Sequence, residues 1–129
     1  QQALEIQLKT LGPNHPSIAT TYNNIGVVYK DQDEYSEALK YYEQALEIQL
    51  KTLGPNHPSI ATTYNNIGVV YKDQGEYSQA LKYYQQALEI QLKTLGPNHP
   101  SIATTYNNIG LVKVKGSCLA FIKYPPGKE

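Results

Sequence analysis

The chain has 129 residues, with 11 basic and 11 acidic side chains and a formal net charge of zero. This length suits one ordinary globular domain or a short stack of smaller repeated units. The neutral balance argues against binding to nucleic acid or to an anionic membrane, because both require clustered Lys and Arg. No apolar run is long enough to span a bilayer. The single cysteine, Cys118, cannot form an internal disulfide, so we expect a reducing compartment and a cytoplasmic protein.

The sequence is a tandem repeat with a period of 42 residues. Residues 1–42 and 43–84 differ only at Gln1/Glu43, Asp33/Gly75 and Glu37/Gln79. A third copy matches the second through Gly110 apart from Gln85, which stands at the position of Glu43, and then diverges, with Leu111 and Lys113 at the positions of Val69 and Tyr71. We therefore divide the chain into tandem repeats over 1–112 (1–42, 43–84 and a partial 85–112) and a divergent tail over 113–129. A fixed period of this length indicates a solenoid or a propeller.

Each period contains two segments with helical spacing, separated by turn residues. The first runs from Ser59 to about Asp73, and its apolar residues recur every three or four positions: Ile60, Tyr64, Ile67, Val70 and Tyr71. The second continues to about Leu95 with the same spacing: Tyr77, Ala80, Leu81, Tyr84, Ala87, Leu88, Leu92 and Leu95. We call these helix A and helix B of a repeat. Strand patterns are absent from the repeats, so the period predicts an all-α solenoid rather than a propeller.

The turns between these segments have residues that end and begin helices. Gly54 suits the left-handed conformation that ends a helix, and Pro58 suits the first turn of the next, with His57 or Asn56 as its N-cap. The exchange of Asp33 for Gly75 fits a turn with positive φ. We therefore expect a Pro-rich turn between repeats and a tight turn within each one.

The segment from Tyr64 to Leu88 resembles the tetratricopeptide repeat. The matched positions are Tyr64, Ile67-Gly68, Tyr71, Gly75, Tyr77, Ala80, Tyr84 and Ala87. The usual repeat has about 34 residues, whereas here helix B is longer, as in the 42-residue variety seen in kinesin light chains. The resemblance covers residues 1 to about 112. It implies a right-handed superhelix of antiparallel helix pairs that acts as a non-enzymatic protein-interaction scaffold.

The residues also predict how the two helices of a repeat pack. Gly26, Gly68 and Gly110 lie within helix A, where Gly costs about 1 kcal/mol relative to Ala. We expect close approach of helix B to compensate, with Ala38 and Ala80 as the facing small residues. A large side chain at Gly68 should therefore be more disruptive than one in the helix A surface. We expect the tyrosines to fill the core with their hydroxyls reaching the surface.

The resemblance also implies that helix A lines a concave peptide-binding groove. The positions left over when the apolar stripe is removed are Thr20, Asn23, Asn24, Val27 and Lys30, then Thr62, Asn65, Asn66, Val69 and Lys72, and finally Thr104, Asn107, Asn108 and Leu111. The paired asparagines can read a peptide backbone through their amides. They can equally hydrogen-bond to neighbouring helices and set repeat packing, and one of each pair can serve each purpose. Lys30 and Lys72 are each followed by an Asp. We therefore expect them to lie at solvated helix ends rather than to recognise an acidic peptide.

The sequence offers no catalytic, metal or cofactor site. His15, His57 and His99 occupy equivalent turns and form no cluster, so helix capping is the favoured role. Nucleophile elbows and phosphate loops are absent. We expect no enzymatic activity, no cofactor and no bound metal, and a protein or peptide as the partner.

The two ends of the chain are unlike complete repeats. Residues 1 to about 11 match the second half of helix B, and the third copy lacks a recognisable helix B. The tail can cover the last helix A, remain loose, pair with another chain, or briefly continue helix A at Val112 to Lys115. Because the repeats are identical, we expect head-to-tail stacking or helix exchange between copies. The alternative to a peptide-binding scaffold is a structural or self-assembling spacer without a specific ligand.

Overall fold

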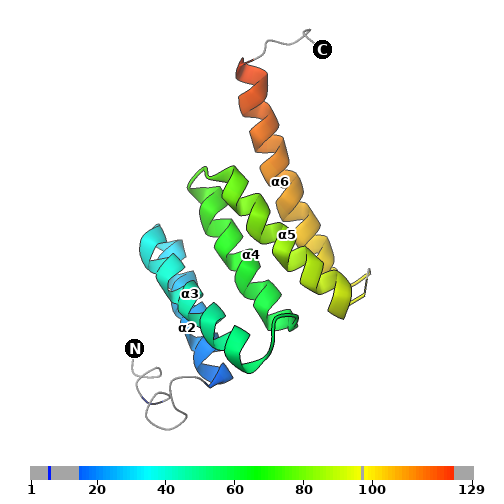
Figure 1. Ribbon diagram of the computed structural model, residues 1–129. Helices are drawn as coiled ribbons and strands as arrows, with labels where there is room; N and C mark the ends of the chain where they lie inside the picture. The colour runs from blue at the N-terminus through cyan, green and yellow to red at the C-terminus, as the bar shows by residue number, and fades with distance from the viewer. Residues whose placement is uncertain (1–5, 7–14, 97, 124–129) are drawn as a thin grey trace.

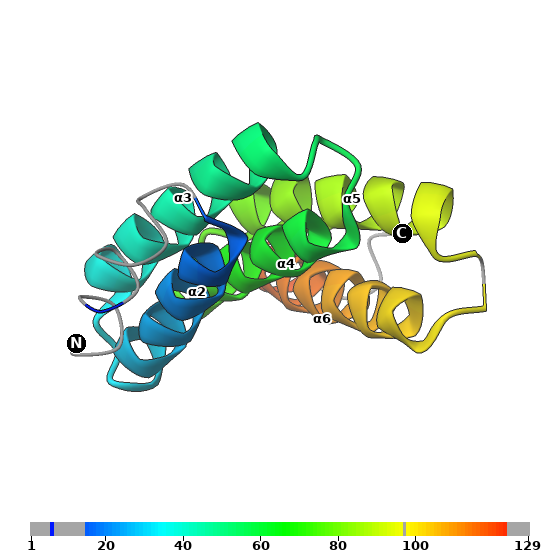
Figure 2. The ribbon, with the colours of Figure 1, turned by 90° about the horizontal axis from the view of Figure 1, so that it is seen from below.

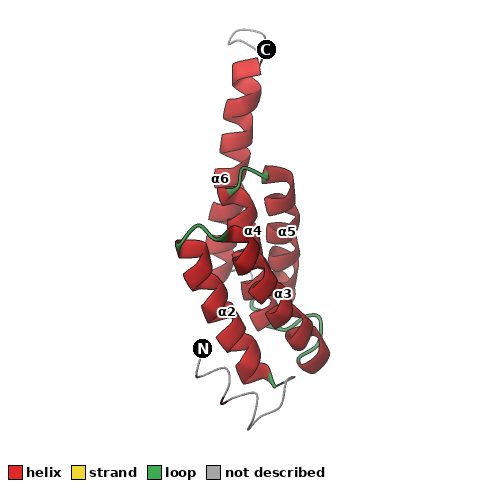
Figure 3. Ribbon diagram, turned by 90° about the vertical axis from the view of Figure 1, so that its left-hand side faces the viewer, coloured by secondary structure: helices red, strands yellow, loops and turns green. Residues whose placement is uncertain are grey.

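The computed structural model describes residue 6, residues 15–96 and residues 98–123. Within these ranges the chain forms five helices, which are α2 (Pro16–Asp31), α3 (Tyr35–Thr52), α4 (Pro58–Asp73), α5 (Tyr77–Thr94) and α6 (Pro100–Lys123). Figure 1 shows them as a stack from α2 to α6, and Figure 3 shows that the described residues contain helices and loops without strands. The predicted all-α repeat architecture is therefore confirmed.

The helices lie in two layers. Helices α2, α4 and α6 are the A helices and form one layer, while α3 and α5 are the B helices and form the other (Figure 2). Neighbouring A helices approach one another within 8 Å between Cα atoms, whereas α3 and α5 do not within the described residues. The A layer therefore lies on the inner side of the curve, because helices on the inside of a bend approach more closely.

Helix starts and tight turns follow the sequence prediction. In all three repeats a histidine is the N-cap: the Nδ1 atoms of His15, His57 and His99 accept hydrogen bonds at 3.1 Å from the backbone N–H two residues later. The turn within each repeat has a positive φ, 62° at Asp33 and 79° at Gly75. Asp and Gly are among the residues that tolerate this conformation, which explains why these two alternate there.

The core consists of small clusters between the A and B helices. In the first repeat Ile18 and Ala19 of α2 pack against Ala45 and Ile48 of α3. The equivalent residues of α4 and α5 form an equivalent cluster. The predicted helix B stripe is wrong at one position, because Leu92 is 44% exposed. Two further clusters join neighbouring repeats, since Ala38 and Tyr42 of α3 pack with Ile67 and Val70 of α4, and Ala80 and Tyr84 of α5 pack with Val112 of α6.

The glycine within helix A faces a tyrosine of helix B rather than an alanine. A methyl group placed on Gly26 would lie 2.5 Å from Cε1 of Tyr42, and one on Gly68 would lie 2.5 Å from Cε1 of Tyr84. Both tyrosines are at most 1% exposed. The expected close approach is therefore present, but the prediction of Ala38 and Ala80 as the facing residues is wrong. The space left by each missing Cβ is filled by an aromatic ring.

Burial of these rings predicts a loss of stability in alkali. Burial, and secondarily the charge of Asp31, raises the pKa of Tyr42 to about 12 from its ordinary 10.0. Burial, and secondarily Asp73, raises the pKa of Tyr84 as well. Above pH 10 these tyrosines therefore lose their protons in the unfolded state before they do so in the folded state. The free energy of unfolding then falls as the pH rises from 10 towards 12. Below pH 10 these two groups do not affect it.

This alkaline loss can be measured by urea unfolding at pH 8, 10 and 11. In the variant Tyr42→Phe the fall in the free energy of unfolding should be shallower, because one titrating group is removed. Tyr106→Phe, at a position that is 53% exposed, is the control and should leave the slope unchanged. An equal slope in Tyr42→Phe and the unmodified chain would contradict the prediction.

The ends of the stack differ from the regular repeats. Helix α6 does not stop where α2 and α4 stop but continues to Lys123, and it extends past the end of the other helices (Figure 1). The helical continuation predicted for residues 112–115 is thus longer than expected, and through Lys123 the tail does not fold back as a cap. The helix predicted for residues 1–11 lies outside the described residues except for Ile6, which is helical.

Candidate peptide-binding surface

One face of each A helix is turned away from its B helix. In α2, Thr20, Asn24 and Val27 are spaced four and three residues apart, so they share this face. The side facing α3 is occupied instead by residues such as Tyr22, which packs against the core, and Gly26. Because the A layer is on the inner side of the curve, this face lines the hollow of the stack.

The first asparagine of each pair does not belong to this face. Asn23 donates from Nδ2 to the hydroxyl of Thr63 at 3.0 Å, and Asn65 donates in the same way to Thr105 at 2.9 Å. Each bond joins an A helix to the A helix of the next repeat. The role in repeat packing, left open by the sequence, is therefore the one that Asn23 and Asn65 serve.

These bonds are part of a buried polar network. The hydroxyl of Thr63 donates to Oε1 of Gln49 at 2.7 Å, and Nε2 of Gln49 reaches the backbone oxygen of Ser59 at 3.4 Å. Thr63 is 0% exposed and Gln49 is 3% exposed. The network thus joins α2, α3 and α4, and a matching Thr105–Gln91 bond of 2.6 Å lies at the next junction.

The sequence prediction includes no structural role for Gln49, Gln91, Thr63 or Thr105. A signal was present, because each is a polar residue next to the predicted apolar stripe and recurs unchanged in every repeat that contains it. Recurrence alone, however, does not distinguish a buried hydrogen bond from a surface residue in copies that are almost identical. The three-dimensional pairing of helices from different repeats was needed to reveal the network.

The second asparagine of each pair is available to a ligand. Asn24 is exposed, Asn66 and Asn108 are half-buried, and none of the three hydrogen-bonds to another described residue. Thr20, Thr62 and Thr104 are also exposed and lie one turn before them. The structure therefore brings a Thr–Asn pair to the inner face of all three A helices.

The remaining predicted residues differ in their surroundings. Val27 is 36% exposed, whereas Val69 packs against the core cluster of Ala80, Tyr84 and Val112 between α5 and α6. Nζ of Lys30 lies 3.5 Å from Oδ1 of Asp31, and Nζ of Lys72 lies 3.8 Å from Oδ1 of Asp73. Lys30 and Lys72 are only 27% and 18% exposed, and these contacts with Asp31 and Asp73 partly neutralise them. Asn107 is exposed at the end of the stack.

Two other features are absent from the described part of the chain. It contains no group of three or more His, Cys, Asp or Glu side chains arranged to hold a metal ion. Over the same residues, no helix combines the length and the apolar character needed to cross a membrane.

Comparison with protein families agrees with this geometry. The family model of the tetratricopeptide repeat matches residues 1–51, 17–93 and 59–115, which together span most of the chain. The chain belongs to the tetratricopeptide repeat family. Repeats of this family generally mediate protein–protein interaction or scaffolding. Among curated protein sequences, no relative matches the chain.

Solved structures show the same kind of repeat. The chain is similar to the crystal structure of BtubC (BKLC) from P. vanneervenii, with a TM-score of 0.81 and 27% identity over 89% of this chain and 46% of that one. It is also similar to a Podosopora anserina putative kinesin light chain with nearly identical TPR-like repeats, with a TM-score of 0.76 and 31% identity over 86% of this chain and 53% of that one. The chain thus spans about half the length of either structure.

A more distant structure shares the fold alone. The N-terminal domain of stress-induced protein-1 from C. elegans has a TM-score of 0.63 and 17% identity, over 85% of this chain and 76% of that domain. The resemblance predicted from the sequence, to the tetratricopeptide repeats of kinesin light chains, is confirmed by the family model and by the Podosopora anserina structure.

Proposed function

We propose that the chain is a non-enzymatic interaction module that binds an extended peptide along the inner face of the A helices. The observation that carries the proposal is the row of Thr–Asn pairs on this face, where the amides of Asn24, Asn66 and Asn108 have no partner among the described residues. An amide side chain both donates and accepts, so it can pair with the peptide groups of a ligand. The single cysteine supports a further proposal of a cytoplasmic location.

The near-identity of the repeats restricts what the surface can read. Two packed helices per repeat give a rise of roughly 20 Å, and an extended peptide at about 3.3 Å per residue passes about six residues in that distance. The same Thr–Asn pair recurs in each repeat, so it cannot distinguish a varied sequence. We therefore propose recognition of the peptide backbone or of a periodic peptide.

The proposal predicts that the second asparagines are needed for binding and not for folding. A peptide is first selected from a displayed random library against the whole chain. The triple variant Asn24→Ala, Asn66→Ala and Asn108→Ala should bind this peptide at least about tenfold more weakly, because each lost hydrogen bond costs about 0.5–1.5 kcal/mol. Its thermal unfolding temperature should not fall, because alanine favours a helix more than asparagine does.

A matched control uses exposed polar residues of the outer layer. Ser36→Ala and Ser78→Ala, on α3 and α5, should leave the affinity unchanged. If no peptide can be selected, or if the triple variant binds as well as the unmodified chain, the inner face is not the binding surface. The near-identity of the repeats would then favour the second candidate function, a structural spacer selected for stacking.

A further inference from the structure

In the regular repeats, the side of helix A that faces its own helix B is fully covered. In α4, Ile60 and Ala61 are buried against Ala87 and Ile90 of α5. Further along the same side, Gly68 lies directly against the ring of Tyr84. This side of an A helix is therefore built to be covered by a helix with the sequence of helix B.

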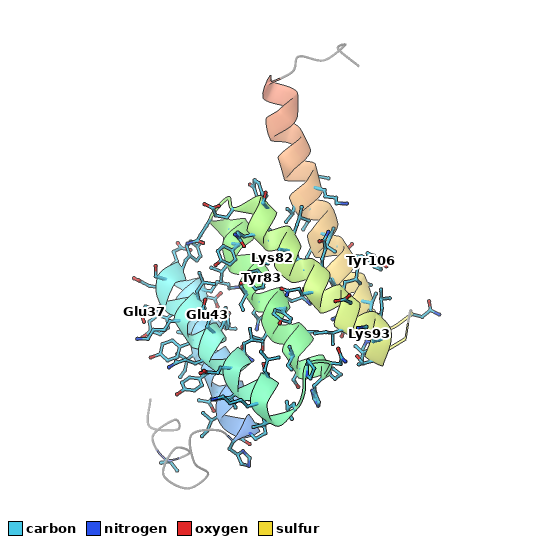
Figure 4. All side chains as sticks on the ribbon, viewed as in Figure 1. Glu37, Glu43, Lys82, Tyr83, Lys93 and Tyr106 are labelled. Atoms are coloured by element: carbon cyan, nitrogen blue, oxygen red, sulfur yellow. The ribbon has the colours of Figure 1, made fainter. Side chains whose placement is uncertain are left out.

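On α6 the same side is open beyond Ile102, which is 1% exposed and therefore already buried. Tyr106 is 53% exposed and projects from the helix (Figure 4). Ala103 is exposed, whereas its counterpart Ala61 is fully buried. Nothing lies within 4 Å of a methyl group placed on Gly110. The opposite side of α6 is covered by α5, since Thr105 and Val112 are 0% exposed. One side of the last A helix thus lacks the cover that its sequence requires.

The other end of the stack is open on the complementary side. Val28 of α2 is 54% exposed, whereas Val70 and Val112 at the same position of α4 and α6 are 0% exposed. Val69 packs against the core cluster that includes Val112. Leu111, which stands at the position of Val69, is 52% exposed. Leu111 and Val28 would form the next contact of the kind that Val69 makes with the cluster of Val112. Both are exposed, and they lie on the helices at opposite ends of the stack (Figure 1).

We propose that copies of the chain associate head to tail, with α2 of a second copy placed against α6 as α6 is placed against α4. Leu111 then meets Val28 of the second copy. Asn107 then donates to its Thr21, as Asn65 donates to Thr105. The contact repeats the junction between α4 and α6. Because it joins two different surfaces, each assembly keeps one unused surface at either end and can add further copies.

The open side of α6 also has an identified occupant. Residues 2–11 have the same sequence as residues 44–53 and 86–95, which form the second half of helix B. Ala3 and Ile6 stand at the positions of Ala45 and Ile48, the residues that cover the Ile–Ala pair of α2. In the proposed assembly, residues 2–11 of the second copy cover the exposed Ala103 of α6, next to Ile102, which is already buried. This inference goes beyond the proposed function, because peptide binding by one chain does not require it.

Sedimentation equilibrium from micromolar to millimolar concentration tests the proposal. The weight-average mass of the unmodified chain should rise to at least twice the 14.4 kDa of one copy. Leu111→Lys and Val28→Lys should each remain at the mass of one copy, with unchanged helix content by circular dichroism because both positions are exposed. A chain that stays at one copy throughout this range would overturn the proposal.

Mixing the two variants identifies which surfaces meet. Each variant retains one intact end, so a mixture of Leu111→Lys and Val28→Lys should form dimers and stop there. If Val28→Lys alone assembles as the unmodified chain does, α6 pairs with something other than α2 and the proposal is wrong. Leu50→Lys is the control, because Leu50 is 41% exposed on α3, a helix of the other layer that takes no part in the proposed contact between α2 and α6, and it should assemble normally.

Discussion

Replacing Gly68 with alanine will destabilise the chain, whereas the same replacement at Gly110 will stabilise it. At Gly68 the added methyl group would lie 2.5 Å from Cε1 of the buried Tyr84. The ring has no free space to move into, since Tyr84 is 0% exposed. Overpacking of this kind costs about 1–3 kcal/mol, which outweighs the gain in helix propensity of about 1 kcal/mol. The free energy of unfolding from urea titration gives the comparison.

Gly110 is the matched control because its helix and its neighbours in sequence are almost the same. A methyl group there meets nothing within 4 Å, so only the helix propensity gain of up to about 1 kcal/mol remains. Gly26→Ala should behave like Gly68→Ala, since Tyr42 is in the equivalent place. If Gly68→Ala and Gly110→Ala shift the free energy of unfolding in the same direction, the contact with Tyr84 does not determine the choice of glycine.

Replacing Thr63 with valine will also destabilise the chain strongly, although the side chains have nearly the same shape. The hydroxyl of Thr63 accepts from Asn23 and donates to Gln49. Without it, Nδ2 of Asn23 and Oε1 of Gln49 lose their hydrogen-bond partner between the repeats. Each buried polar group left in this way costs about 1–3 kcal/mol, so we expect a total loss of about 2–4 kcal/mol. Urea unfolding of the whole chain measures it.

Thr62→Val is the control for this change. Thr62 is exposed on the neighbouring position of the same helix, and its replacement should alter the free energy of unfolding by less than about 0.5 kcal/mol. Adding Asn23→Ala and Gln49→Leu to Thr63→Val should recover part of the loss, because no unpaired polar group then remains. Equal stability of Thr63→Val and Thr62→Val would show that the network contributes nothing.

Much of the fold could be predicted because its signals are local. Helix A begins at Pro58 and ends at Asp73, within one residue of the range expected from spacing and turn residues. The caps at His15 and His57 and the positive φ at Asp33 depend only on residues close in sequence. Caps and turns of this kind can be predicted directly from the sequence. Because the sequence repeats every 42 residues, the same prediction applies to each repeat of the stack.

The candidate site was only half predictable. Spacing placed Asn23 and Asn24 on helix A, but adjacent residues in a helix point about 100° apart. Which of them faces the next repeat depends on how the A helices pack. Asn23 meets Thr63, 40 residues away in sequence, while Asn24 remains exposed. No local pattern distinguishes two identical side chains in neighbouring positions.

The sequence by itself determined the repeat period, the helices, their caps and the composition of the inner face. These follow from spacing and from the conformational preferences of single residues. Only the tertiary structure determined that Gly68 accommodates a tyrosine ring, that Gln49 and Thr63 are joined in a buried network, and that Val28 and Leu111 are exposed at opposite ends. The reason is that identical repeats have identical local sequences, so differences between the ends and the interior arise only from which neighbours are present.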